Sequence, residues 1–197
     1  MNRDRVRRLA LPLAAFLFSV IVLGIAIVSL VDFRRDEPVI SSVGGPFALT
    51  AQDGRTVTNK DLLGAPFLVF FGFTHCPDVC PTTLFEASEL LRAAGPEGDK
   101  LRVLFVTVDP ERDTPEVLKS YLGAFDPRII GLSGSPETIA AVLKSYKVYA
   151  RKVPTSDGYT MDHTAMVYLM DAKGGFVNGF DLKRAPDVAA KDLLSYL

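Results

Sequence analysis

The chain has 197 residues, of which 48% are hydrophobic, and this length suits one ordinary domain plus an additional segment while excluding wholesale disorder. Its two cysteines and two histidines are too few for a disulfide-dense miniature fold, a four-cysteine zinc site or a three-histidine metal centre, so any such chemistry must use Cys76, Cys80, His75 and His163. The net charge of -1 is unevenly divided: residues 1–35 hold six basic and two acidic residues, whereas the rest of the chain holds 16 basic and 21 acidic residues. This mildly acidic remainder gives no reason to expect nucleic-acid binding.

The N-terminal part of the chain predicts a membrane anchor. Residues 9–31 form an uncharged, mostly apolar run of 23 residues, long enough to cross a hydrocarbon core of roughly 30 Å. Four arginines lie within residues 1–8, so this end is expected in the cytoplasm and the rest of the chain outside it. A cleaved signal peptide is the alternative, although its apolar region is usually shorter and followed by a clear cleavage site.

Export has consequences for the chemistry. We expect residues 32–44 to be a linker and residues 45–197 to be a domain in a bacterial periplasm. A mitochondrial intermembrane space is the alternative, but the N-terminus lacks an amphipathic transit segment. In either compartment the two cysteines can become oxidised.

The domain alternates strand and helix signals. Asp53-Gly54 marks a hairpin turn between short apolar segments, and a seven-residue apolar run at 67–73 predicts a strand buried on both faces. Further strands are expected at 101–108, 129–132, 148–153, 164–170 and 176–180, with residues 154–162 as a polar loop. Helices are expected after Pro81, after Asp113 or Thr114, from Ser135 to about Lys144, and from Pro186. This order predicts an α/β fold with one mixed sheet covered by helices.

Cys76 and Cys80 lie four residues apart, where the first buried strand gives way to a helix. If this turn is helical, the two sulfurs share one face and can hold a metal ion or form a disulfide. A disulfide closing so short a ring would be a weak structural staple, and the polar neighbours argue against two buried core cysteines. The spacing alone leaves metal binding and dithiol redox chemistry both open.

A histidine could complete the site. Two thiolates and one imidazole suit copper better than structural zinc, which takes four protein ligands. His75 directly precedes Cys76, and adjacent side chains diverge, whereas His163 faces the cysteine loop if the two strands beside them are neighbours. Either histidine could instead be a surface residue. Asp78 and Asp162 could orient the site or balance its charge. Met161, Met166 and Met170 lie near His163, and we expect Met166 and Met170 to pack in the core.

Three segments resemble the Sco/SenC family, whose members are membrane-anchored proteins that help to assemble the copper centre of cytochrome c oxidase. They are FGFTHCPDVCP at 71–81, VDPERDTP at 108–115 and DHT at 162–164. Their order and spacing match from about Phe47 to the C-terminus. The resemblance implies a thioredoxin-like fold preceded by a transmembrane helix, and copper, as Cu(I) or Cu(II), bound by Cys76, Cys80 and His163.

The resemblance implies a metallochaperone that delivers copper to the oxidase subunit carrying the dinuclear copper site. Other copper chaperones and thioredoxin-like reductants are further possible partners. The alternative is a thiol-disulfide reductase that keeps the target cysteines reduced, with Cys76 as nucleophile and Cys80 as resolving thiol. The proline that thioredoxin-like reductases usually place before the facing strand is missing from residues 162–164. A copper or redox sensor is a third possibility, but we find no output domain for it.

Overall fold

A computed structural model describes residues 16, 18–24 and 43–197. The chain divides into two units, residues 1–40 and 41–197, and each is described by itself. In the first unit, Phe16 and residues 18–24 are helical and exposed. Among the described residues, no helix is long and apolar enough to span a bilayer. Most of the predicted anchor (9–31) and linker (32–44), and all of residues 1–8, lie outside the described residues.

The second unit is an α/β domain with its strands and helices mostly alternating. Its strands are β1 (Ala48–Ala51), β2 (Thr56–Thr58), β3 (Phe67–Gly72), β4 (Arg102–Thr107), β5 (Ile129–Ser133), β6 (Ala150–Thr155), β7 (Gly158–His163), β8 (Val167–Met170) and β9 (Phe176–Gly179). Its α-helices are α2 (Val79–Ala94), α3 (Pro115–Leu122), α4 (Pro136–Ser145) and α5 (Pro186–Leu194), and two short 3-10 helices are η1 (Asn59–Leu62) and η2 (Gly95–Lys100).

Seven strands form one mixed sheet in the order β2-β1-β5-β4-β3-β8-β9. The central strands β3, β4 and β5 are parallel, while β1 and β8 run antiparallel to their neighbours. The three central strands are buried along almost their whole length, as continuous apolar runs predict for a sheet covered on both faces. The predicted mixed sheet and the hairpin between β1 and β2 are therefore confirmed.

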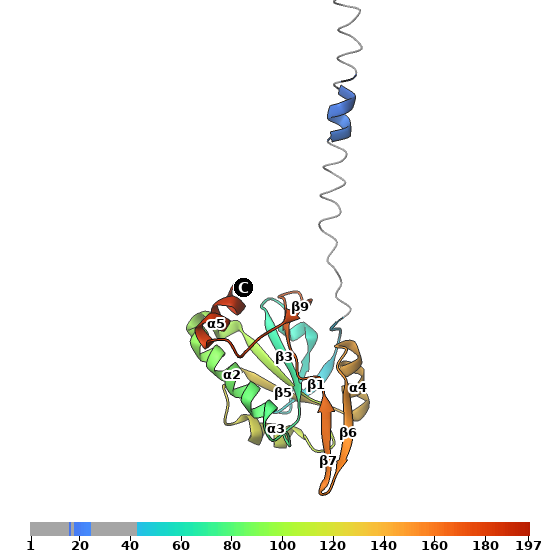
Figure 1. Ribbon diagram of the computed structural model, residues 1–197, viewed down its shortest axis with the longest axis vertical. Coiled ribbons are helices and arrows are strands. Elements are labelled where there is room, and N and C mark those ends of the chain that lie inside the picture. The colour runs from blue at the N-terminus through green and yellow to red at the C-terminus, as the bar shows by residue number, and fades with distance from the viewer. Residues whose placement is uncertain (1–15, 17, 25–42) are drawn as a thin grey trace, which may run out of the picture. The chain divides into compact units, whose positions relative to one another are not determined.

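Helices cover both faces of this sheet, with α2 and α5 on one side and α4 on the other (Figure 1). On the α4 side, Tyr146 just after the helix packs against Phe71 and Tyr168, with ring centroids 5.3 and 5.9 Å away. On the α2 side, Phe105 of β4 contacts Phe70 and Tyr121 of α3. These aromatic contacts join the sheet to its helices and make the core continuous.

One edge of the sheet gathers the segments that carry the sequence motifs. The carboxyl ends of β3 and β4 are neighbours there, because Gly72 pairs with Thr107. Strand β8 runs antiparallel to β3, with Val167 opposite Phe70, so the residues before β8 start from the same edge. The segment before β8 therefore begins beside the cysteine loop that follows β3.

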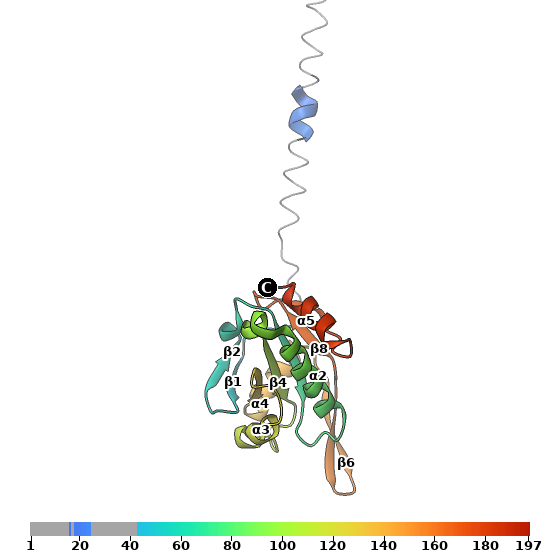
Figure 2. The ribbon, with the colours of Figure 1, turned by 90° about the vertical axis from the view of Figure 1, so that its left-hand side faces the viewer.

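The prediction for residues 154–162 is wrong. These residues belong to a two-stranded antiparallel hairpin formed by β6 and β7, in which Ala150 pairs with His163. The hairpin is separate from the main sheet and projects from the domain in both views (Figures 1 and 2). His163 is thus the last residue of a strand, and the loop is confined to the turn at residues 156–157.

The helix starts follow the predicted capping pattern. Thr114 caps α3 by accepting a hydrogen bond from the backbone N–H of Val117 (3.3 Å), and Ser135 caps α4 by accepting one from Thr138 (3.2 Å). The sequence left Asp113 and Thr114 as equal candidates for the first cap. Asp113 is instead fully buried and has a different role, described below.

Candidate metal centre

The two cysteines are free thiols in contact at the start of α2. Cys76 lies in the loop after β3 and is partly exposed, whereas Cys80 is in the first turn of the helix and fully buried. The backbone N–H of Cys80 points to the sulfur of Cys76 at 3.4 Å. This contact places the first turn of α2 beside the sulfur of Cys76.

The sulfur of Cys80 is enclosed by the core. Burial raises the pKa of this thiol well above its usual range, and the nearby sulfur of Cys76 and carboxylate of Asp113 act in the same direction. Gly72 makes room for it, because a Cβ at that position would lie 2.9 Å from the sulfur and 2.5 Å from the Phe105 ring. Cys80 is therefore protonated near neutral pH, and it loses this proton when it binds a metal ion or is oxidised to a disulfide.

His163 stands beside the loop that carries Cys76. Its ring packs edge-on against Phe73, with centroids 5.7 Å apart, and the carbonyl of Phe73 accepts a hydrogen bond from the N–H of Cys76 (3.2 Å). The Nδ1 of His163 lies 3.0 Å from the carbonyl oxygen of Thr164. Because a carbonyl oxygen can only accept, Nδ1 is the donor in this contact, and in the neutral tautomer that makes it Nε2 offers the lone pair that a metal ligand needs.

These three residues are not arranged as a closed metal site. Within residues 43–197, no three His, Cys, Asp or Glu side chains are placed to hold a metal ion as they stand. The backbone N–H of Cys80 reaches the sulfur of Cys76, while His163 reaches the same loop through Phe73.

The other predicted residues lie at the rim. His75 is exposed, and its Nδ1 lies 3.2 Å from the hydroxyl of Thr74. Asp78 is the exposed residue before α2, and its side chain accepts a long hydrogen bond from Thr82 (3.5 Å). Asp162 is also exposed and pairs with Arg151 at 3.8 Å. Asp162 and His163 are adjacent in β7, so their side chains point to opposite faces of the hairpin.

The methionines divide differently from the prediction. Met170 is fully buried in β8, as expected. The expectation that Met166 packs in the core is wrong, because it precedes β8, is 38% exposed and lies over Gly179 on the neighbouring strand. Met161 is partly buried against the core from the hairpin. Met166 also lies outside the strand expected at 164–170, since β8 begins only at Val167.

Asp113 supports the cysteine loop, a role that the sequence did not indicate. Its carboxylate accepts hydrogen bonds from the backbone N–H of Thr74 (3.0 Å), the hydroxyl of Thr74 (2.6 Å) and the hydroxyl of Thr107 (2.7 Å). Ser133 of β5 donates to its backbone carbonyl (2.7 Å). Through Thr74, two residues before Cys76, the loop after β3 is thus connected to β4, β5 and the start of α3.

A second cluster joins the hairpin to the loop after β4. Asp109 is buried and accepts hydrogen bonds from Arg112 and from the hydroxyl of Tyr159 (2.9 Å). Arg112 also donates to the carbonyl of Tyr159 (3.0 Å), and its guanidinium lies 3.8 Å from the centroid of that ring. The sequence identified the motif at 108–115 as a family segment and a helix start, without these contacts. Its four charges within five residues after a buried strand were the available signal.

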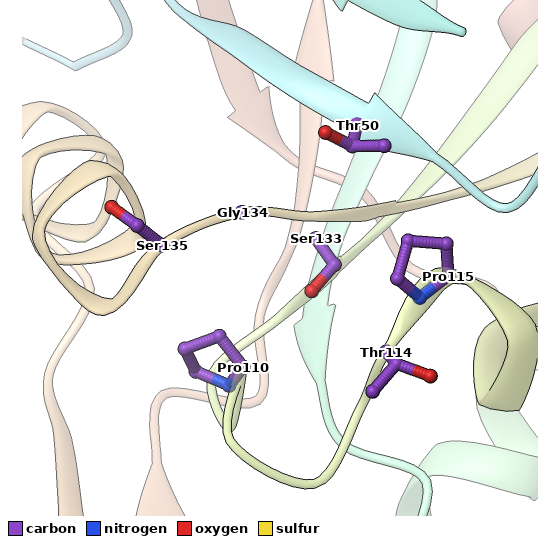
Figure 3. Close-up of a pocket in the computed structure, with 7 residues that line it drawn as sticks. All are labelled: Thr50, Pro110, Thr114, Pro115, Ser133, Gly134 and Ser135. Atoms are coloured by element: carbon purple, nitrogen blue, oxygen red, sulfur yellow. The ribbon is translucent and has the colours of Figure 1, made fainter. Parts of the chain in front are cut away.

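A hollow at this edge of the sheet lies apart from the cysteines and histidines. It is lined by residues from β1, the loop after β4 and the loop after β5, as Figure 3 shows, namely Thr50, Pro110, Thr114, Pro115, Ser133, Gly134 and Ser135. The hydroxyls of Thr114 and Ser135 already cap helices, and that of Ser133 is bonded to Asp113. The hollow contains neither of the two cysteines nor either histidine.

Comparisons with known proteins agree with this geometry. The family model described as SCO1/SenC matches residues 35–197. Protein SenC of Rhodobacter capsulatus is 35% identical over 196 residues, covering 94% of this chain and 89% of SenC. The mitochondrial SCO1 homolog 1 of Arabidopsis thaliana is 39% identical over 162 residues, covering 79% of this chain but only 48% of its own length. This chain therefore spans about half of that curated relative.

A solved structure extends the likeness to three dimensions. The structure of Bradyrhizobium japonicum ScoI with copper bound superimposes with a TM-score of 0.77 at 62% identity, covering 79% of this chain and 99% of that one. The mixed α/β, thioredoxin-like fold expected from the motifs is thereby confirmed.

Proposed function

This chain belongs to the SCO1/SenC family, whose members act in copper assembly of cytochrome c oxidase, and we propose that it is itself a copper metallochaperone. In this proposal Cys76, Cys80 and His163 hold one copper ion, as Cu(I) or Cu(II), and pass it to the oxidase subunit with the dinuclear copper site. The observation that carries the proposal is the position of His163 beside the cysteine loop, with Nδ1 engaged and Nε2 free. Two sulfurs and one imidazole nitrogen are a ligand set that copper favours.

The ligand set also explains how copper could be handed on. A three-coordinate ion leaves a position at which an incoming thiolate or imidazole can bind before the first ligands leave. Cys76 and His163 are partly exposed, so both are accessible to such a partner, whereas Cys80 is buried. Asp78 and Asp162 complete the proposal as exposed carboxylates near this rim, able to balance the charge of the ion.

The test compares the purified, reduced full chain with two histidine variants. One equivalent of copper is added without oxygen, and the stoichiometry and the thiolate-to-Cu(II) absorption are recorded. We expect one copper per chain, with the absorption lost or strongly changed in His163→Ala and retained in the matched control His75→Ala. An unchanged spectrum in His163→Ala would remove His163 from the site and with it the main support for the proposal. Copper transfer to an isolated apo-oxidase subunit is the second readout.

A thiol-disulfide reductase remains the alternative, favoured by the contact between the two cysteines. Cys76 is the more exposed of the two and Cys80 is buried, which suits a nucleophile followed by a resolving thiol. Reductase turnover that survives His163→Ala but is lost in Cys76→Ser, in a chain that does not retain copper, would establish this function instead.

The proposed setting is an inner membrane with the domain in the periplasm. Residues 9–31 would form the single anchor, and residues 1–8 would stay in the cytoplasm. Extraction of membranes at alkaline pH should leave the full chain in the pellet. Release of the chain into the supernatant would favour the cleaved signal peptide.

A further inference from the structure

We propose that Arg112 is a positioning residue that sets the place of His163, so that the third copper ligand is held near the cysteines before copper arrives. This inference rests on the proposed function. Arg112 lies in the loop after β4, 51 positions before His163. It acts through the hairpin of β6 and β7, whose last residue is His163. The hairpin belongs to a separate two-stranded sheet, so its strands receive no ladder hydrogen bonds from the main sheet. Its orientation is fixed by the hydrogen bonds between Tyr149 and Thr164 at its base and by side-chain contacts along its length.

Arg112 provides a largely enclosed set of these contacts. Its Nε donates to the buried carboxylate of Asp109, and its Nη1 donates to the backbone carbonyl of Tyr159 in β7 (3.0 Å). The guanidinium lies 3.8 Å from the centroid of the Tyr159 ring, and the hydroxyl of Tyr159 donates a hydrogen bond to the carboxylate of Asp109 (2.9 Å). Only 23% of the arginine side chain is exposed, and none of the aspartate, so salt screens this pair weakly.

The same guanidinium reaches the cysteine loop. It lies 5.9 Å from the ring of Phe73, and that ring is the one on which His163 packs edge-on. Arg112 thus contacts the strand that carries His163 and the aromatic residue between His163 and Cys76. An outer ion pair from Lys152 of β6 to Glu111 (2.6 Å) adds a second tie, but both side chains are about half exposed. Exposed pairs contribute little to stability, so the arginine cluster is the stronger of these two ties.

Lysine cannot replace this arginine, because an ammonium group has no planar fork to bond a carboxylate and a carbonyl while stacking on a ring. Arg112→Lys therefore tests the geometry while keeping the charge. The chain offers a matched control in Arg128→Lys. Arg128 makes a similar pair with Asp126, with comparable exposure of the arginine (22%), but it precedes β5 and lies at the opposite edge of the sheet from the cysteine loop.

The experiment has a metal-free arm and a copper arm. In the metal-free, reduced full chain, amide hydrogen exchange of residues 158–163 should be at least tenfold faster in Arg112→Lys than in wild type and unchanged in Arg128→Lys. With one equivalent of copper, Arg112→Lys should weaken binding by about tenfold or more and move the absorption towards that of His163→Ala. Tyr159→Phe, which removes one hydroxyl and keeps the ring, should give a smaller effect in the same direction.

A double variant decides whether Arg112 acts through His163. In a His163→Ala background, Arg112→Lys should cause no further loss of copper affinity, because the ligand it positions is already gone. Equal losses in both backgrounds, or hairpin exchange and copper spectra like those of wild type, would overturn the inference. If His163→Ala itself leaves copper binding unchanged, the proposed function fails instead, and the hairpin exchange in the metal-free arm still reports on the arginine contact.

Discussion

The carboxylate of Asp113 accepts hydrogen bonds from both the backbone N–H and the hydroxyl of Thr74, at 3.0 and 2.6 Å, across 39 residues of sequence. Two threonines donate to this carboxylate at the site edge of the sheet: Thr107 ends β4, and Thr74 lies in the loop after β3. The motif at 108–115 and the cysteine motif are therefore two parts of one hydrogen-bonded structure.

We expect Asp113→Ala to lower the free energy of unfolding by about 2–4 kcal/mol, because it leaves one buried and two partly buried donors without their acceptor. The matched control is Asp61→Ala. Asp61 accepts the same pair of hydrogen bonds from Thr58, both at 2.7 Å, but at an exposed position, so its loss should lower the free energy of unfolding much less. Denaturant unfolding of the reduced chains measures both, and equal losses would contradict the role given to burial.

The two thiols should differ in reactivity. Cys76 is partly exposed and its sulfur receives an N–H, whereas burial encloses Cys80 and raises its pKa. In the native state, Cys80→Ser, which keeps Cys76, should therefore be alkylated by iodoacetamide at least tenfold faster than Cys76→Ser. The control is the same pair of variants in denaturant, where the rates should converge. A native Cys76→Ser protein that reacts as fast as Cys80→Ser would show that Cys80 is accessible.

The central sheet and the place of the cysteines were predictable because both depend on local sequence. The apolar runs of β3, β4 and β5 indicate buried parallel strands, and parallel strands place the loops that follow them at one edge. The strand pairing that brings His163 there was a conditional prediction, and the register of Phe70 opposite Val167 satisfies its condition.

The hairpin and its supports could not be predicted in the same way. Strands β6 and β7 are largely exposed and have neither an apolar run nor a clear alternation of burial. Their orientation depends on Arg112 and Tyr159, which are 47 residues apart. Asp113 was hidden for a different reason, because Asp-Thr-Pro matches a helix start and Thr114 alone accounts for that pattern.

Gly72 should not tolerate a side chain. A Cβ there would lie 2.5 Å from the ring of Phe105 and 2.9 Å from the sulfur of Cys80, so the core beneath the cysteine would have to shift. We expect Gly72→Ala to destabilise the domain by about 1–3 kcal/mol and to increase the alkylation rate of Cys80. Gly123→Ala is the control, because its Cβ would meet only backbone oxygens at 3.4 Å. An unfolding midpoint and Cys80 reactivity like those of wild type in Gly72→Ala would contradict the predicted crowding.

Tyr146 gives the domain a pH dependence at the alkaline end. Its ring is packed between Phe71 and Tyr168, and burial raises its pKa to about 12 from the usual value near 10. Below pH of about 10 the residue is protonated in both the folded and the unfolded chain and adds no slope. Between about pH 10 and 12 the unfolded chain loses the proton first, so the stability falls by up to about 1.4 kcal/mol per pH unit from this residue.

Tyr146→Phe removes that contribution, so its free energy of unfolding should fall less steeply than that of wild type across this pH range. Tyr149→Phe, at a residue that is 52% exposed, controls for the loss of a hydroxyl outside the core. Urea unfolding at several pH values gives the three slopes. Parallel curves for wild type and Tyr146→Phe would mean that the buried ring is not the source of the alkaline loss, and the other enclosed tyrosine of this cluster, Tyr168, whose pKa is also raised by burial, would be tested next.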